Sequence, residues 1–534
     1  MAGRIASAAW VRFAVFILLI GPYPRISAGS EFVIDLAHPS GSAKEAVLFP
    51  FDTYAIPMRR GLQIDLLHSE HTRAPYNPVL VRGKPGAPDS FRIGYYGSVI
   101  EINGRFHMWY IGDGDGDKVD QEKSTAYTHL LYAVSDDGLH WQKPDLGLVE
   151  YNGDKNNNLV QMNDENIYRA CTVLYEPDDP NPEHRYKIFF EGNGSRGHVS
   201  YSRDGLVWHP SPLNPVTKMP FEQSGLIKRD GMYYVAGQVP EDWGGSTHRV
   251  LATFMSGDFE HWTDVMSVGF RRDPLPPKGV YWAFNNGPQV HLGAGLWDRG
   301  NVAVGLYGQW NGDAADIDRR YMKMNLGLVI THDGIHYTEP RPDFKMINSD
   351  EENWALDAMG SPPRLSQGQG FVNHDDKTMT YYGHWGKDGN KEIRVAVWER
   401  DRLGQYSVRP HPIEGQYPAT RGALEQPKPA DELPCLISCP IALPPGGAQV
   451  FVNCGNLSRH GELRVSVVDR MFKPVEGYSI EQCVPVQADG FRIPIHWKRG
   501  DRIEHAEGPI RLRVQWDGVR FEDPVVYAVY VLPG

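Results

Sequence analysis

Short runs of apolar and β-branched residues recur along most of the chain, and they are typical of β-strands rather than of helices. Five of these runs each lead directly into an acidic turn. They span residues 131–134, 198–201, 250–253, 326–329 and 393–397. Few stretches show the longer period of a helix, so the pattern predicts an all-β protein in which helices are minor.

The acidic turns themselves form a repeat. Ser135–Trp141 (SDDGLHW) returns as Ser202–Trp208 (SRDGLVW), and weaker copies follow at 256–262 and 331–337. A degenerate copy is expected at 399–402. The Asp-Gly pair suits a tight turn, because Gly takes positive φ freely and Asp can bond its own backbone. The copies recur roughly every 50 to 75 residues, which predicts successive blades of a β-propeller with loop insertions.

Each repeat also contains a pair of strands that precedes the acidic turn. Asn103-Gly104 and Asp230-Gly231 are tight hairpin turns between two of these pairs. Five pairs are predicted, one for each blade: 97–102 with 106–110, 171–175 with 186–190, 225–227 with 232–235, 289–292 with 302–306, and 363–365 with 379–382. With the strand before each turn and an outer strand, each blade would have four strands.

The sequence changes character after Tyr406, where six prolines between 410 and 434 indicate a linker or an irregular seam. Alternating runs follow at 449–452, 463–468, 510–514 and 526–530. Their density predicts a β-sandwich. The expected organisation is therefore a signal peptide at 1–28, an irregular lead-in packed on the propeller at 29–92, a five-bladed β-propeller at 93–409 and a C-terminal β-sandwich at 410–534.

The amino-acid composition and the N-terminal sequence restrict the functions and locations that we expect for this protein. The 534 residues carry a formal net charge of −12, which argues against a nucleic-acid partner because phosphate binding requires clustered Lys and Arg. Arg4 and Arg12, the apolar run 13–20 and the small residues Ser27-Ala28 are typical of an export signal. We therefore expect a periplasmic or extracellular protein with no membrane span after cleavage; a retained N-terminal anchor is the alternative. The sequence leaves the oligomeric state open.

Export would permit disulfide bonds. Cys171 lies alone in the repeat region, whereas Cys435, Cys439, Cys454 and Cys483 fall near the C-terminus. Four cysteines allow three pairings, and the sequence does not choose among them.

A five-bladed array followed by a sandwich resembles the clan of glycoside hydrolase families 32, 43 and 68. The most specific local match is Phe221–Ile227 (FEQSGLI), at the start of the third blade. In family 32 a similar stretch contains the glutamate that acts as general acid. The resemblance therefore implies a glycosidase with a carbohydrate substrate, in which Glu222 is the general acid.

Two carboxylates of the clan are missing from their expected places. The clan has an Asp before the first inner strand and another before the second, where this chain has Tyr95-Tyr96-Gly97 and Arg169-Ala170-Cys171. Asp357 is the substitute that we expect to act as base, because Trp354–Asp357 repeats the pattern of Trp282–Asn285 one blade earlier. The alternative is that Asp357 caps a loop or forms a structural ion pair.

Other residues near the predicted funnel are candidates for substrate binding. Aromatic side chains can stack on the apolar face of a sugar, and Arg169 could hold an anionic group through its planar guanidinium. Core packing and a structural ion pair are the alternatives. The full set of candidates is Tyr95, Tyr96, Arg169, Trp282, Asn285, Asn286 and Trp354.

One acidic loop is a candidate metal-binding site. Asp113, Asp115 and Asp117 place oxygen ligands at alternating positions, as calcium-binding loops do. The loop is not an EF-hand, because its twelfth position is Ser124. Calcium binding and a solvated loop at the rim of the active site both remain open. The chain has no nucleotide-binding motif, so no cofactor is expected to be required.

Three functions compete on the sequence alone. The first is an exported glycoside hydrolase with Glu222 as acid and Asp357 as base. The second is a carbohydrate-binding or scaffold propeller without catalysis, which the two missing Asp residues favour. The third is a sialidase-like enzyme, because Ser-x-Asp-Gly-x-x-Trp is similar to the Asp-box turn of sialidases.

Overall fold

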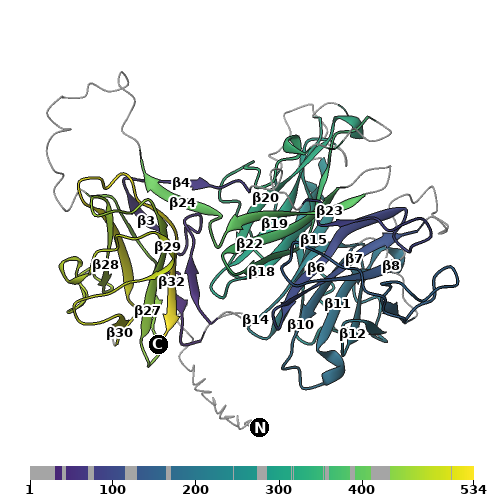
Figure 1. Ribbon diagram of the computed structural model, residues 1–534, viewed down its shortest axis with the longest axis horizontal. Coiled ribbons are helices and arrows are strands. Elements are labelled where there is room, and N and C mark those ends of the chain that lie inside the picture. The colour runs from purple at the N-terminus through teal and green to yellow at the C-terminus, as the bar shows by residue number, and fades with distance from the viewer. Residues whose placement is uncertain are drawn as a thin grey trace, which may run out of the picture.

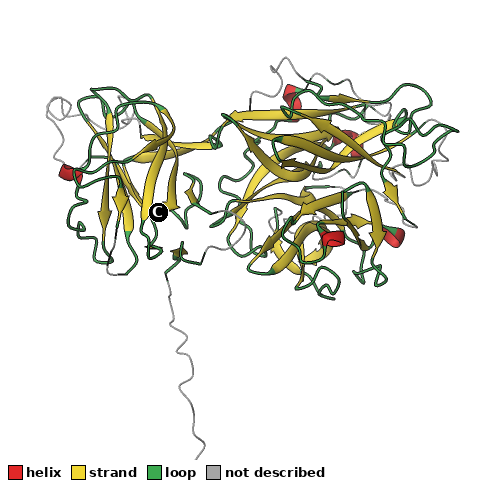
Figure 2. Ribbon diagram, turned by 60° about the horizontal axis from the view of Figure 1, so that its bottom comes forward, coloured by secondary structure: helices red, strands yellow, loops and turns green. Residues whose placement is uncertain are grey.

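The computed structural model is almost entirely β, with only short helical turns between strands (Figure 2). The helical turns are 3₁₀ segments: η2 (Pro182–His184), η3 (Asn193–Ser195), η4 (Arg319–Tyr321), η5 (Ser349–Glu351) and η6 (Ile480–Gln482). The structure describes residues 31–38, 44–69, 77–114, 129–163, 170–243, 246–272, 286–313, 316, 318–352, 354, 360–384, 391–409, 433–504, 506 and 508–534. The all-β prediction is confirmed.

The repeat region folds into five successive sheets, which are antiparallel except where β9 pairs in parallel with β13. The first contains β6 (Arg92–Ile102), β7 (Arg105–Asp113) and β8 (His129–Ser135), and the second β10 (Cys171–Tyr175), β11 (Tyr186–Glu191), β12 (Gly197–Ser202), β13 (Val207–Pro210) and β9 (Gln161–Met162). The third contains β14 (Glu222–Arg229), β15 (Met232–Trp243), β16 (Ser246–Ser256) and β17 (Ser267–Phe270). The fourth contains β18 (Pro288–Asp298), β19 (Ala303–Asn311) and β20 (Lys323–Thr331), and the fifth β21 (Leu365–His374), β22 (Lys377–His384), β23 (Glu392–Glu399) and β5 (Leu80–Val81).

The first three predicted strand pairs are present, whereas in the fourth and fifth sheets residues 303–306 lie opposite 295–298 and Met379 lies opposite Val372, so 289–292 and 363–365 are not the predicted partners. Cys171 lies opposite Phe190, Val99 opposite Met108, and Leu226 opposite Val235. The first strands of the five sheets, β6, β10, β14, β18 and β21, also contact one another in order, and β21 contacts β6 again. These inner strands therefore form a closed ring around a channel, the arrangement of a β-propeller.

Glycines let the inner strands approach closely. A Cβ on Gly225 would lie 2.0 Å from the carbonyl oxygen of Ala294, and a Cβ on Gly295 would lie 1.9 Å from that of Gly368. Both oxygens belong to the neighbouring inner strand. Only glycine is compatible with these contacts, so the ring depends on these positions.

The acidic turns adopt one geometry in four copies. In the second copy, Asp204 Oδ1 accepts hydrogen bonds from the Leu206 and Val207 amides at 2.8 and 3.0 Å, and Trp208 Nε1 donates to the Gly205 carbonyl at 3.0 Å. The copies at 135–141, 256–262 and 331–337 repeat this pattern. The predicted fifth copy is wrong, because Asp401 is fully buried and pairs with Arg299 instead.

A second unit consists of two sheets that share one hydrophobic core. The larger sheet contains β29 (Gly490–Pro494), β27 (Ala448–Gly455), β32 (Val525–Pro533), β24 (Gly404–Val408) and β4 (Leu62–Leu66), with β2 (Ala46–Leu48) and β30 (Arg502–Ile503) at its margins. The smaller contains β28 (Glu462–Val468), β31 (Arg511–Asp517), β25 (Cys435–Ile437) and β3 (Met58–Arg60). β1 (Ile34–Asp35) pairs with β26 (Ile441–Ala442).

The N-terminal lead-in differs from its prediction. Strands β2, β3 and β4 pair with β32, β25 and β24, so this segment is part of the second unit, where it lies among the C-terminal strands in Figure 1. Only β5 joins the propeller, as the outer strand of the fifth sheet. These strands are two to five residues long and have no local hairpin partner, so the sequence pattern does not reveal their pairing. Residues 1–30 and the Pro-rich segment 410–432 lie outside the described residues.

A buried ionic network and an apolar cluster join the two units. Arg299, in the turn after β18, pairs with Asp401 and lies 3.1 Å from Glu45. Tyr530 of β32 donates a hydrogen bond to Asp401 at 2.9 Å. Around this network, Val47, Phe49 and Tyr530 pack in one cluster with residues of the fourth and fifth sheets. The lead-in therefore connects the second unit to the propeller through both charge and apolar contact.

All five cysteines are buried, and none forms a disulfide bond. Burial raises the pKa of the Cys439 and Cys454 thiols to about 12, so both stay protonated near neutral pH. The four C-terminal cysteines thus act as core residues. The described part of the chain contains no helix with the length and apolarity that a membrane span requires.

Candidate functional site

The channel has two ends, and different side chains lie at each. We call the end where the five inner strands begin the amino end, and the end where they finish the carboxyl end. Glu222 is the first residue of β14 and lies at the amino end, whereas Glu101, near the end of β6, lies at the carboxyl end. The two glutamates are therefore at opposite ends of the channel.

Glu222 is half-buried, and its carboxylate is held by a defined partner. Gln238 Nε2 donates to Glu222 Oε2 at 2.7 Å, and the Gln238 Oε1 atom accepts a hydrogen bond from the Leu292 amide at 2.7 Å. Gln238 is buried, so this chain of bonds is largely shielded from water. It fixes the orientation of the carboxylate between the third and fourth sheets.

A β-bulge explains why Gln238 is the partner. From the Asp230-Gly231 turn, the register pairs Arg229 with Met232 and Gly225 with Ala236. This register would place Val239 opposite Glu222, but it shifts by one residue between Gln223 and Gly225, so Gln238 lies there instead. Side chains directly opposite one another share a face of the sheet. Gln238 could not be predicted from the sequence, because a bulge has no clear signal apart from the nearby glycine.

Glutamine side chains also connect inner strands that share no backbone ladder. Gln223 Nε2 donates to the Ala170 carbonyl at 2.9 Å, and Gln367 Nε2 donates to the His291 carbonyl at 2.9 Å. Gln369 bonds both backbone groups of Leu226, accepting from its amide at 2.9 Å and donating to its carbonyl at 2.6 Å. These amides stiffen the ring on which Glu222 is mounted.

The two tyrosines proposed for sugar stacking are core residues. Tyr95 is fully buried, its ring packs near Tyr381, and burial raises the pKa of its hydroxyl. Tyr96 is 6% exposed and packs in the cluster that contains Trp109 and Leu292. The prediction that Tyr95 offers a face to substrate is wrong, because the core covers that face, and Tyr96 offers little surface.

Trp354 and Asn286 also form hydrogen bonds with other residues of the protein. Trp354 donates through Nε1 to Glu392 at 2.6 Å, and the Arg394 guanidinium lies 4.5 Å from the centre of its ring. Asn286 is buried, and its carbonyl accepts a hydrogen bond from Gln289 at 2.9 Å. Trp354 is half-buried, so part of its surface stays accessible beside these contacts.

The predicted calcium ligand Asp113 has a different role. It is fully buried and forms a bidentate ion pair with Arg92, with Oδ1 and Oδ2 at 2.9 and 2.6 Å from the guanidinium. Its oxygens are therefore occupied by a cation of the chain itself. Among the described residues no three His, Cys, Asp or Glu side chains gather as a metal site would require.

The remaining predicted site residues lie outside the described residues. They are Arg169, Trp282, Asn285 and Asp357, together with Asp115 and Asp117 of the acidic loop. Of the predicted catalytic pair, the structure therefore places Glu222.

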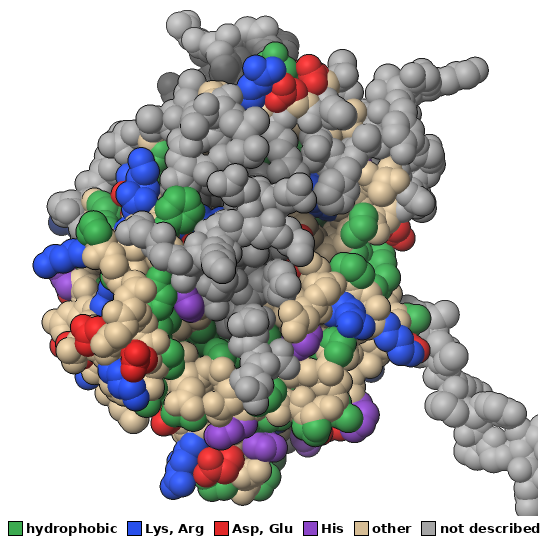
Figure 3. All heavy atoms as spheres, turned by 90° about the vertical axis from the view of Figure 1, so that its right-hand side faces the viewer, with side chains coloured by type: hydrophobic (Ala, Val, Ile, Leu, Met, Phe, Trp, Pro, Cys, Tyr) green, Lys and Arg blue, Asp and Glu red, His purple; other side chains and the backbone are tan. Residues whose placement is uncertain are grey.

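Charges of both signs lie close together on the face of the molecule that Figure 3 shows. In Figure 3, Lys and Arg side chains lie beside Asp and Glu side chains on the face shown. Such a surface differs from the clustered basic face that a nucleic-acid partner requires.

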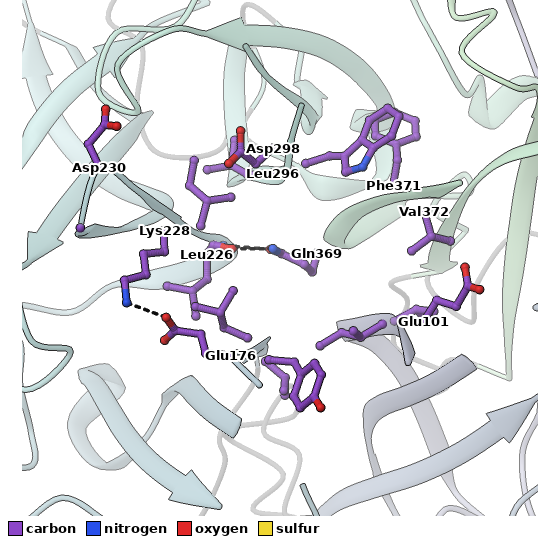
Figure 4. A pocket seen from close by; sticks show the side chains of 18 residues that line it. Glu101, Glu176, Leu226, Lys228, Asp230, Leu296, Asp298, Gln369, Phe371 and Val372 are labelled. Carbon is purple, nitrogen blue, oxygen red and sulfur yellow. Dashed lines mark hydrogen bonds and ion pairs between the residues drawn. The ribbon is translucent and has the colours of Figure 1, made fainter. Parts of the chain in front are cut away.

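The carboxyl end of the channel contains a cavity of ≈ 650 Å³ (Figure 4). All five inner strands contribute to its wall. Glu101 lines this cavity and Glu222 does not. The cavity is therefore separate from the site built around Glu222.

Comparison with known proteins gives only distant likenesses. No protein-family model matches the chain, and no curated protein matches its sequence. Among solved structures, a glycosyl hydrolase from Bacteroides ovatus is 15% identical, with a TM-score of 0.39, over 63% of this chain and 95% of that one. A thermostable family-43 glycoside hydrolase is 12% identical, with a TM-score of 0.36, over 65% and 98%.

A third structure comes from work on the GH130 family of mannoside phosphorylases, described as containing glycoside hydrolases that target β-1,2-mannosidic linkages in Candida mannan. It is 15% identical, with a TM-score of 0.40, over 63% of this chain and 95% of that one. Likenesses at these scores assign neither a family nor an activity to this chain.

Proposed function

We propose that this protein is a glycoside hydrolase that cleaves a poly- or oligosaccharide at the amino end of a five-bladed β-propeller, to which a C-terminal β-sandwich is attached. The observation that carries the proposal is the half-buried Glu222 carboxylate, which begins the inner strand of the third sheet and is oriented by Gln238. Cleavage of a glycosidic bond requires a carboxylic acid that protonates the leaving oxygen. Glu222 is the group assigned to that step.

A second carboxylate must attack the sugar or activate water. Asp357 is proposed for this role, because its segment repeats the pattern of the segment that ends at Asn285 one blade earlier. A separation of about 5 Å between the two carboxyl groups would give retention of configuration, and about 6.5 to 9.5 Å would give inversion.

The protein is also proposed to act outside the cytoplasm. The basic residues Arg4 and Arg12, the apolar run 13–20 and the small residues at 27–28 support an export signal. A polysaccharide substrate is in keeping with that location, because large glycans do not cross membranes unaided.

Release of reducing sugar from a panel of neutral and sulfated polysaccharides tests the activity. The purified protein would be compared with Glu222→Gln and with Glu101→Gln as a matched control. Both substitutions remove one carboxylate and preserve shape, but they act at opposite ends of the channel. We expect Glu222→Gln to lower kcat by about 10² to 10⁴ with little change in KM, because general acid catalysis contributes that much.

The opposite pattern would contradict the assignment. Loss of activity in Glu101→Gln, with full activity in Glu222→Gln, would move the chemistry to the carboxyl end. Retention of the protein on a polysaccharide affinity gel without any sugar release would favour a binding module instead.

A further inference from the structure

The cavity at the carboxyl end of the channel has the size and position of a ligand site. Its volume of ≈ 650 Å³ lies within the range of small-molecule pockets, about 300 to 1,000 Å³. Gln369 of β21 bonds the backbone of Leu226 of β14, and these two strands are not neighbours in the ring. The two bonds therefore cross the ring beside the cavity, as Figure 4 shows for the contact between Leu226 and Gln369.

Most of the cavity wall is apolar. Aliphatic side chains from every inner strand contribute, among them Val99, Val173, Leu226 and Leu296. Three aromatic residues, Tyr175, Trp297 and Phe371, also line it. Aromatic faces attract organic cations, and they do so most strongly when water is excluded.

Carboxylates surround this apolar wall. Four of them, Glu101, Glu176, Asp230 and Asp298, line the cavity together with one amine, Lys228. Glu176 lies 2.6 Å from Lys228 and 2.8 Å from Lys187, and Asp298 lies 3.4 Å from Arg229. These two carboxylates are therefore neutralised by neighbours.

The other two carboxylates are not neutralised in this way. Glu101 lies 3.6 Å from a ring nitrogen of His374, and no cation of the described residues lies within ion-pair distance of Asp230. In Figure 4, Glu101 and Asp230 lie on opposite sides of the cavity. An entering ligand would meet negative charge at both sides and an apolar, partly aromatic surface within.

We propose that this cavity is a second ligand site, distinct from the Glu222 site, and that it binds an organic ammonium cation with an apolar body. The apolar wall favours the body of such a ligand through burial, and Glu101 and Asp230 favour its charge. An anion of the same shape would be repelled by the same two carboxylates.

Fluorescence titration of the full-length protein tests this proposal with two dyes. Berberine is an apolar aromatic cation, and 1-anilinonaphthalene-8-sulfonate is an apolar aromatic anion; both become brighter in apolar surroundings. We expect saturable binding of one berberine per chain, and no competition from the anionic dye.

Substitutions at the rim test the charge requirement. The double variant Glu101→Gln, Asp230→Asn should weaken berberine binding by about tenfold or more, because two nearby charges are lost. Both side chains are exposed, and asparagine tolerates the positive φ of 50° at position 230, so folding should not change. The matched control Asp145→Asn, Glu150→Gln removes the same charge from exposed residues that do not line the cavity, and it should leave affinity unchanged.

A substitution that fills the cavity tests the location of the berberine site. Val372→Trp adds bulk at a half-buried position on the cavity wall and should abolish berberine binding, whereas Val265→Trp, at a position that is 72% exposed and outside the cavity, should not. Berberine affinity that is unchanged in both the rim double variant and Val372→Trp would overturn the proposal. Equal binding of the anionic dye at the same site would overturn the charge selectivity. Sugar release depends on Glu222, so failure of either proposal is distinguishable from failure of the other.

Discussion

At the scale of single residues, the orientation of Glu222 depends on Gln238 and, through it, on the Leu292 amide. The position of Glu222 at the start of an inner strand could be predicted, because the hydrophobic run after it and the Asp230-Gly231 turn define the hairpin. Its partner could not, because the one-residue bulge exchanges Val239 for Gln238. The burial of Tyr95 could not be predicted either. An aromatic residue that lines the mouth of the propeller channel and one that packs in the core have the same sequence pattern.

Replacement of Gln238 by leucine tests this positioning role. Leucine has a similar size but cannot donate to Glu222, and it leaves the Leu292 amide without its acceptor. We expect kcat for sugar release to fall by about tenfold or more while KM changes little, because a loosely oriented acid transfers its proton less efficiently. Gln238→Glu, which keeps an acceptor for Leu292 but loses the donor to Glu222, separates the two bonds. Unchanged kcat in both variants would show that Gln238 has only a structural role.

At the scale of elements, the repeated acidic turn was the most predictable feature of the chain. Its spacing, its Asp-Gly pair and its aromatic residue predicted four turns that share one hydrogen-bond pattern. The fifth failed because Gln405 stands at the position of the aromatic residue, and Asp401 forms an ion pair with Arg299 instead. Local turn chemistry is encoded locally, whereas an ion pair between distant segments is not.

Asp204→Ala should destabilise the second sheet. The substitution leaves the Leu206 and Val207 amides without their acceptor and removes the bond from Ser202, which should cost about 1 to 2 kcal/mol. Thermal unfolding monitored by circular dichroism measures the effect as a lower Tm. Asp178→Ala, at an exposed position in the turn between β10 and β11, is the control and should leave Tm unchanged.

The same turn predicts a pH dependence. Burial of the Asp204 carboxyl tends to raise its pKa, but the hydrogen bonds from Val207, Leu206 and Ser202 outweigh burial and lower it. The stabilisation is therefore fully present above the unfolded pKa of about 3.9 and is lost as pH falls through the lower folded value. The difference in Tm between the wild type and Asp204→Ala should shrink as pH falls from 5 to 2.5. A difference that stays constant over this range would contradict the account.

At the scale of the whole molecule, ring closure and the pairing of distant segments determine the fold. The sequence predicted the order of strands around the ring, but it did not reveal that the lead-in belongs to the second unit. That pairing joins Ala46–Leu48 to Val529–Val531, almost 500 residues away, and the three-residue strand β2 is too short to carry a pattern.

Gly225→Ala tests ring closure. The new Cβ would lie 2.0 Å from the Ala294 carbonyl oxygen, a backbone atom that cannot move without displacing β18. We expect a loss of about 3 kcal/mol in the free energy of unfolding, or failure to fold. Gly257→Ala is the matched control, because the nearest atom to its Cβ would be Met232 Sδ at 3.8 Å. A Tm for Gly225→Ala equal to that of Gly257→Ala would mean that the ring is looser than described.

His332 links the two units in a pH-dependent way. Its Nε2 lies 3.0 Å from buried Asp52, and its Nδ1 lies 2.9 Å from the Asn301 carbonyl. Burial tends to lower the pKa of His332, but Asp52 outweighs burial and raises it. The stabilisation is therefore fully present below the unfolded pKa of about 6.5 and is lost as pH rises through the higher folded value.

The measurement for His332 is the Tm between pH 6 and 8.5. The wild type should lose more stability over this range than His332→Gln does, whereas His209→Gln, at an exposed position, should follow the wild type. Parallel curves for the wild type and His332→Gln would show that the contact does not titrate.

The central claim is that Glu222 protonates the leaving group at the amino end of the channel. Once the polysaccharide panel has identified the sugar, kcat/KM would be measured for the wild type and Glu222→Gln with two substrates of that sugar, a natural oligosaccharide and an aryl glycoside whose phenolate leaves without protonation. The account predicts a loss of about 10² or more on the oligosaccharide and a much smaller loss on the aryl glycoside. An equal loss on both substrates would contradict the assignment of Glu222 as the acid.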